Sequence, residues 1–172
     1  MDPTRPAAKY DSIVDLQLKL TAVTMSNQTQ PRTQEQSSSP FPSMYETGLS
    51  TRKEVLGSMH VNRSLANTNA FTLPMQETIT EFAWGSIWNR PGLDRKQRSL
   101  MNIGILIALN RQLELGVHVR GTVRNGLSEL EIREAVMHSL VYCGAPAAME
   151  GMRTVDRTLE EMEREGEIKR EL

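Results

Sequence analysis

The sequence predicts an all-α protein, and three observations support this class. From residue 44 onward, apolar residues recur at spacings of three and four, the period of a helix packed on one face. Ser, Asp, Gly and Pro stand between these segments, at the positions where helices begin and end. No convincing length of the chain alternates apolar and polar residues as a half-buried strand does.

The chain divides into a helical domain and an N-terminal extension. It has 172 residues and a formal net charge of -1. Residues 44–172 are long enough to bury a hydrophobic core and are predicted to form one domain. Residues 1–43 are predicted to be largely disordered, because 26–43 are rich in Ser, Gln, Thr and Pro. Within the extension, residues 11–23 have the spacing of a short, weakly held helix.

The first three helices of the domain are predicted over 44–57, 74–89 and 95–109. Pro74 suits a first helical turn, and Pro91 prevents the second helix from continuing. Its apolar face is predicted to comprise Met75, Ile79, Phe82 and Ala83. Asp94 and Gln97 form a capping box for the third helix. That helix is apolar nearly all round, which predicts burial, at Leu100, Ile103, Ile105, Leu106, Ile107 and Leu109.

Three further helices complete the domain. The fourth covers 113–124 and ends at Asn125-Gly126. A second capping box, Ser128 with Glu131, opens a helix that stops at Gly144. The last helix begins at Pro146 and carries an amphipathic stripe of Ala148, Met152, Val155, Leu159 and Met162.

Composition removes several classes of function. A charge near zero gives no reason to expect nucleic acid or an anionic membrane as partner. No apolar run approaches the roughly 20 residues that span a bilayer. No secretory signal is recognisable, so a cytoplasmic protein is expected. Cys143 is the single cysteine, which excludes an intramolecular disulfide and a CxxC motif, and we interpret it as a small core residue.

The segment ELGVHVRG places two titratable residues on one face of a helix. Glu114 and His118 are four residues apart, within hydrogen-bonding reach. An isolated pair of this kind is more often a solvent-side pair than a functional site. A metal site would need at least one more protein ligand, and neither His60 nor His138 has a recognisable ligand spacing. A redox role would need a second thiol beside Cys143. An acid/base pair remains the functional alternative.

Other residues near this pair favour a binding site. Trp84 and Trp88 lie one helical turn apart and would form an aromatic wall. Guanidinium groups bind carboxylates in a bidentate manner. Three arginines lie near helix ends or beside the pair, namely Arg90, Arg98 and Arg120.

Four stretches resemble the carboxymuconolactone decarboxylase family. They are YETGLSTRKEVLGSMHVNRSL, ITEFAWGSIWNRPGLDRKQRSL, ELGVHVRGTVRNGLSELEIREAV and VYCGAPAAMEG, in this order between about Tyr45 and Leu159. The resemblance implies an AhpD-like helical bundle that assembles as a homo-oligomer, a trimer or hexamer. Redox members of that superfamily carry CxxCxxxH. Superposing its histidine on His118 puts Glu114 and Arg111 in place of the cysteines, so no thiol peroxidase activity is expected.

The resemblance also implies a reaction, the decarboxylation of a carboxylated lactone without metal or other cofactor. The small-molecule substrate can take up the electrons itself, because the carbanion is conjugated with the lactone carbonyl. The protein must then hold carboxylates, stabilise an oxyanion and deliver a proton to carbon. His118 would deliver the proton, and Glu114 would favour its charged form. Substrate binding would fall to Arg98, Arg120, Arg90, Trp84 and Trp88.

Two alternatives remain at this stage. The N-terminal extension lies outside the family core, and it favours a tailoring enzyme of fungal-type secondary metabolism acting on a larger polyketide or lactone. The other alternative is a non-catalytic helical assembly protein. The pairing of Glu114 with His118 beside several arginines argues against that second reading.

Overall fold

The computed structural model describes residues 42–170 and 172, and within this part every regular element is helical. The predicted all-α class is therefore confirmed. The predictions made for residues 1–41, including the short helix over 11–23, lie outside the described residues.

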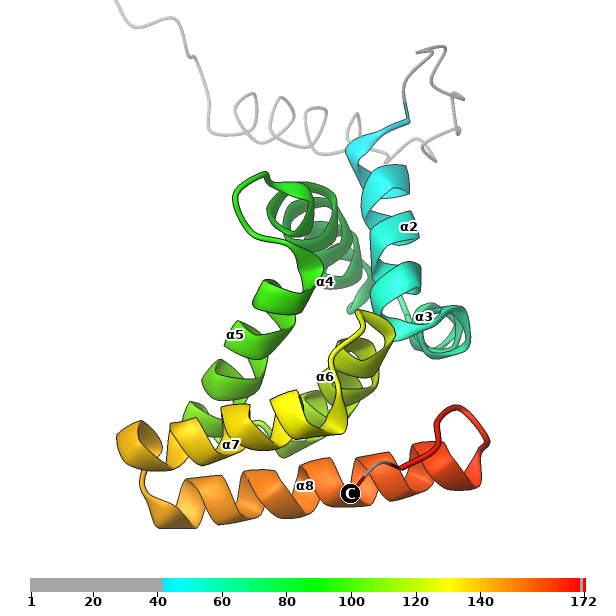
Figure 1. The fold of residues 1–172 in the computed structure, drawn as a ribbon. Helices are drawn as coiled ribbons and strands as arrows, with labels where there is room; N and C mark the ends of the chain where they lie inside the picture. The colour runs from blue at the N-terminus through cyan, green and yellow to red at the C-terminus, as the bar shows by residue number, and fades with distance from the viewer. Residues whose placement is uncertain (1–41, 171) are drawn as a thin grey trace, which may run out of the picture. The chain divides into compact units, whose positions relative to one another are not determined.

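The helices follow one another with short connections (Figure 1). Most predicted boundaries agree with the structure to within two residues. In chain order the elements are α2 Met44–Leu56, α3 Ser58–Ala66, α4 Leu73–Thr78, the π-helix η1 Ile79–Ser86, the 3-10 turn η2 Ile87–Asn89, α5 Arg95–Ala108, α6 Gln112–Arg124, α7 Glu129–Cys143 and α8 Ala145–Arg164.

Both predicted capping boxes are present. The Asp94 carboxylate accepts a hydrogen bond from the Gln97 amide at 2.8 Å, and Gln97 Oε1 accepts one from the Asp94 amide at 2.9 Å. Ser128 and Glu131 make the same reciprocal pair at the start of α7. A third box, Ser43 with Glu46, opens α2. Each cap stabilises its helix by about 1 kcal/mol, because it satisfies amides that have no partner within the helix.

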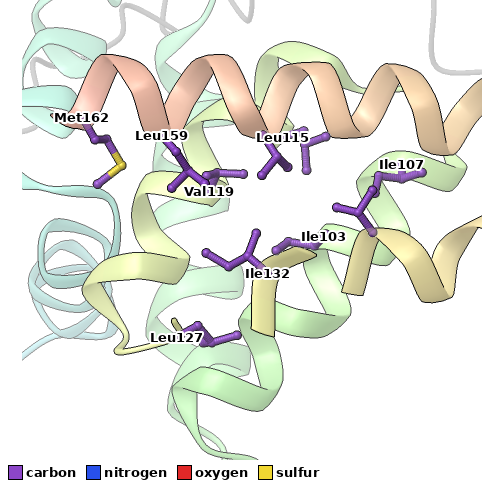
Figure 2. Packing of buried hydrophobic residues seen from close by; sticks show 10 residues of the cluster. Ile103, Ile107, Leu115, Val119, Leu127, Ile132, Leu159 and Met162 are labelled. Carbon is purple, nitrogen blue, oxygen red and sulfur yellow. The ribbon is translucent and has the colours of Figure 1, made fainter. Parts of the chain in front are cut away.

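The main core lies between α5, α6, α7 and α8. Helices α7 and α8 lie side by side and run antiparallel (Figure 1). Figure 2 shows the side chains of α5 and α6 meeting those of α7 and α8 in one continuous cluster. The cluster comprises Ile103, Ile107, Leu115, Val119, Leu127, Ile132, Val136, Val155, Leu159 and Met162.

A second, smaller core joins α2, α3 and η1. It contains Val55, Leu56, Val61 and Trp84. Helix α2 and η1 approach backbone to backbone: a Cβ atom on Gly48 would lie only 2.0 Å from the carbonyl oxygen of Thr80. Glycine is required at position 48 because any side chain would push the two helices apart. This contact fixes the segment that carries Trp84.

Two predicted faces differ from the structure. Helix α5 is not buried all round, because only Ser99, Ile103 and Ile107 are buried, and the apolar Leu100 and Ile105 are exposed. This chain packs α6, α7 and α8 against one side of α5 and leaves the other side open.

The face predicted for 74–89 is wrong at three of its four residues: Met75, Ile79 and Phe82 are exposed, and only Ala83 packs against the second core. Thr80 and Trp84 are buried instead. The physical reason is the π-helix. A π-helix has a wider turn than an α-helix, closed by i to i+5 hydrogen bonds. The residues that point towards the core therefore differ from those expected for the α-helical period.

Helix α3 was not predicted. It begins directly after Gly57, whose φ of 87° turns the chain between α2 and α3. Only Val61 of α3 is buried, so apolar spacing carries little signal for this helix.

Candidate functional site

Three aromatic rings from different elements stack beside one another. The indoles of Trp84 from η1 and Trp88 from η2 have centroids 4.8 Å apart and planes at 22°. The imidazole of His118 from α6 lies 6.2 Å from Trp84 at 8° and 6.4 Å from Trp88 at 17°. The structure therefore brings together the histidine and both tryptophans that the sequence singled out.

Polar contacts hold the segment that carries the two indoles. The side-chain amide of Asn89 donates to the Trp84 carbonyl at 2.7 Å and to Thr51 Oγ1 of α2 at 3.0 Å. At the other end of η1, Arg52 of α2 donates to Thr80 Oγ1 at 3.2 Å. A π-helix is intrinsically rare and occurs frequently at functional sites. Here it places Trp84, which is only 5% exposed, between α2 and the imidazole.

His118 is neutral near pH 7 in this arrangement. Burial lowers the pKa of its imidazole to about 4, and this outweighs the nearby Glu114 carboxylate, which raises it. Asn102 Nδ2 of α5 lies 3.4 Å from Nδ1. An amide that donates to Nδ1 leaves the proton of the neutral ring on Nε2. Glu114 therefore favours the charged form of His118, as expected from the sequence, but burial outweighs it and leaves the imidazole uncharged in the unliganded chain.

Glu114, Arg98 and Arg90 lie in α6, in α5 and directly after η2. Glu114 is exposed one turn before His118 and acts on it through charge. Arg98 donates from Nη2 to the Arg90 carbonyl at 2.7 Å, which joins the first turn of α5 to the end of η2. Its Nε is buried without a hydrogen-bond partner among the described residues. Arg90 itself is exposed.

Arg120 lies on a different side of α6 from His118. Residues two apart on a helix do not share a face. The Arg120 guanidinium contacts three carboxylates, which include Glu165 at 2.7 Å and Glu167 at 3.1 Å. The hydrogen bond that Arg120 donates to the Glu165 carboxylate raises the pKa of Arg120, so its charge is firmly held. In this chain Arg120 is paired with protein carboxylates and does not join the stacked rings.

A pocket of about 870 Å³ opens on that other side of α6. Its walls come from α3, α6, α8 and the segment that follows α8, and neither Glu114 nor His118 lines it. His60 and Arg63 of α3 face it, although sequence reasoning gave them no role. The stretch HVNRS contains both residues, but their spacing alone specifies no chemistry.

Other predicted features can also be placed. Within residues 42–170 and 172, no three or more His, Cys, Asp or Glu side chains gather as metal ligands would. Cys143 is partly buried and packs against the main core. None of the helices in the described part of the chain is long and apolar enough to span a bilayer.

The all-helical domain and the stacking of His118 on Trp84 and Trp88 agree with the fold and the site residues expected from the family resemblance. The model of the carboxymuconolactone decarboxylase family matches residues 74–157. The nitrosuccinic acid decarboxylase of Metarhizium robertsii is 52% identical over 127 residues, which cover 74% of this chain and 89% of that protein. The 4-carboxymuconolactone decarboxylase of Acinetobacter baylyi is 43% identical over 118 residues, covering 69% and 88%.

The chain belongs to the carboxymuconolactone decarboxylase family. Both relatives are decarboxylases by name, so the prediction of a carboxy-lyase is confirmed at the level of the family. Their names also point to small-molecule acids, which agrees with the class of partner expected from the sequence.

Proposed function

We propose that this chain decarboxylates a small acid that carries two carboxylates, without a cofactor, at the surface formed by Trp84, Trp88 and His118. The observation that carries the proposal is the stacking of an uncharged imidazole on two indoles, 6.2 and 6.4 Å from their centroids. Such a surface is poorly hydrated, yet it holds one group that can exchange a proton.

The substrates named for the two relatives share one chemical feature. In nitrosuccinic acid, one carboxylate is bound to the carbon that bears the nitro group. In 4-carboxymuconolactone, loss of the ring carboxylate leaves a carbanion conjugated with the lactone carbonyl. In both acids the electrons left by departing carbon dioxide move onto electronegative oxygens of the substrate. An enzyme of this kind needs no separate electron sink.

The indoles favour the step in which carbon dioxide leaves. A carboxylate placed against Trp84 and Trp88 exchanges part of its hydration for apolar contact, which raises its free energy. In the transition state the negative charge spreads over the nitro group or the lactone, and spread charge depends less on hydration. The stacked rings therefore penalise the bound acid more than the transition state, which lowers the barrier.

His118 supplies the proton that the carbanion needs. When the anionic substrate binds, its negative charge raises the pKa of the imidazole, and Glu114 acts in the same direction. His118 then takes up a proton from solvent as the complex forms and delivers it to carbon after carbon dioxide has left. Transfer of this proton to carbon leaves the imidazole neutral, and the site is ready for another substrate once the product departs.

Turnover of both acids tests this proposal. We expect release of carbon dioxide from nitrosuccinic acid, because the relative named for that activity is 52% identical. Release of carbon dioxide from 4-carboxymuconolactone should be measured in parallel. His118→Ala should lower kcat by about two to four orders of magnitude, the usual contribution of general acid/base catalysis. Glu114→Gln should cost less, because it removes a charge and keeps a polar side chain.

His138→Ala is the matched control, because His138 is an exposed histidine of α7 whose ring lies tilted beside Tyr142 and not against an indole. It should leave kcat unchanged. A His118→Ala variant with raised KM and normal kcat would make His118 a substrate anchor and would contradict its role as proton donor. Absence of turnover on both acids would contradict the proposed substrate class and would favour the larger polyketide or lactone.

We also propose that the chain assembles with copies of itself as a trimer or hexamer. Large apolar side chains lie exposed along α4, η1 and α5, and stable monomers rarely leave so many uncovered. They include Met75, Phe82, Met101, Ile105 and Leu109. Sedimentation equilibrium should show an oligomer that Phe82→Glu with Met101→Glu converts to monomer. A wild-type protein that is monomeric at micromolar concentration would refute this.

A further inference from the structure

The pocket on the far side of α6 has an uncompensated positive charge. Four arginines and three glutamates line it. All three glutamates are ion-paired with Arg120 or Arg124. Arg63 of α3 and Arg157 of α8 line two other walls, and neither has a carboxylate partner among residues 42–170 and 172. Two free guanidinium groups thus face the same 870 Å³ space.

A buried arginine near the pocket adds to this charge. Arg52 is only 6% exposed, and its hydrogen-bond partners are the neutral side chains of Gln76, Thr80 and Ser64. Its Nε has no partner in the described part of the chain. A buried charge without a counterion is costly, and its field extends far because little water screens it. Arg52 is one of the residues that act electrostatically on His60, which lines the pocket.

His60 reports the local potential. Burial lowers the pKa of its imidazole, and four arginines lower it further: Arg63, Arg52, Arg124 and Arg120. The carboxylates of Glu161, Glu165 and Glu167 line the same pocket. The three glutamates are ion-paired with Arg120 and Arg124, and with Arg63 and Arg157 the four arginines outnumber the three carboxylates of the lining.

We propose that this pocket is a second binding site, separate from the stacked rings, and that it takes a small dicarboxylate. One carboxylate binds the guanidinium of Arg63 and the other binds that of Arg157, with His60 beside them. Planar guanidinium groups suit carboxylates because they donate two parallel hydrogen bonds. A dianion also matches the two cations that the protein leaves unpaired. The inference does not depend on decarboxylation, because neither His118 nor either indole lines this pocket.

Binding of succinate to the full chain tests the site. Calorimetry should show saturable binding, and the Cε1–H resonance of His60 should shift with the same dissociation constant. Arg63→Ala and Arg157→Ala should each weaken this binding by about tenfold or more, the loss expected for one bidentate ion pair. Both side chains are exposed and without partners in the described part of the chain, so neither variant should disturb folding.

Arg153→Ala is the matched control. Arg153 lies one turn before Arg157 on the same helix, pairs with Glu150 and does not line the pocket. It removes the same net charge and should leave succinate affinity unchanged. An equal loss in Arg153→Ala would reduce the effect to overall charge and overturn the proposal. Acetate should bind at least tenfold more weakly than succinate at equal ionic strength, because it can engage only one arginine.

The histidine resonances separate this site from the stacked rings. The proposal of a second site would be overturned if succinate shifted only the His118 resonance, or if its binding did not saturate at tens of millimolar. A shift at both histidines supports it if only the His60 component is lost in Arg63→Ala. His118→Ala should lower kcat by about two to four orders of magnitude and leave the His60 shift intact. Failure of the second site and failure of the proposed decarboxylation are thereby distinguishable.

Discussion

Acid should destabilise the folded chain through His118. Its pKa is lowered from 6.5 to about 4 in the folded state, mainly by burial. Between these values the unfolded chain binds the proton more readily than the folded chain, so folding stability falls as the pH drops from about 6.5 towards 4. A difference of about 2.5 pKa units corresponds to about 3 kcal/mol, and most of it, about 2.5 kcal/mol, should be lost by pH 4.5.

Urea unfolding at pH 7 and pH 4.5 measures this loss. His118→Gln keeps a polar side chain but cannot be protonated, so it should lose about 2 kcal/mol less than wild type over that interval. His138→Gln, on the exposed face of α7, serves as the control and should lose as much as wild type. The Cε1–H resonance of His118 should titrate with a midpoint well below 5. A midpoint at or above 6.5, or equal acid sensitivity in wild type and His118→Gln, would refute the reasoning.

Three further changes test the packing around the site. Gly48→Ala should destabilise the chain by at least 1–3 kcal/mol, read as a fall in Tm, because its Cβ would lie 2.0 Å from the Thr80 carbonyl oxygen. Asn89→Ala should cost about 1–3 kcal/mol and weaken the near-ultraviolet circular dichroism of the indoles, because the Trp84 carbonyl loses its 2.7 Å donor. A native-like dichroism spectrum in that variant would show that Asn89 does not hold η1. Arg120→Ala should lower the free energy of unfolding by about 1 kcal/mol and leave KM unchanged. A large rise in KM would show that Arg120 binds the substrate.

Local signals in the sequence predicted most of the fold. Capping boxes are contacts between residues three apart, so Asp94 with Gln97 and Ser128 with Glu131 can be recognised before any tertiary structure is known. Helix α3 escaped prediction because it buries only Val61 and begins without a side-chain cap. The π-helix escaped for a different reason. It packs against α2 at the close approach of Gly48 and Thr80, which are 32 positions apart, and local sequence patterns do not report such a contact.

The sequence predicted which site residues lie together wherever they share one helical face or lie one turn apart. Glu114 with His118, and Trp84 with Trp88, needed only the helical period. The meeting of these two pairs is a tertiary contact that the sequence could suggest but not locate. The state of His118 could not be predicted, because the sequence shows the neighbouring Glu114 and not the degree of burial. The large desolvation of the imidazole reverses the effect expected from Glu114 alone.

Arg120 shows how sequence proximity misleads in the opposite direction. It lies two residues from His118, and this closeness suggested a single site that holds both a proton donor and a carboxylate clamp. On a helix, two residues correspond to a rotation of about 200°, so the two side chains serve opposite surfaces. His118 is packed among uncharged rings, where burial lowers its pKa, and Arg120 lies among carboxylates, where ion pairing raises its pKa. Helix α6 therefore separates an apolar, neutral surface from a strongly charged one. The decarboxylation that we propose at the stacked rings depends on that separation, because arginines beside His118 would keep the surface hydrated and the bound carboxylate stable.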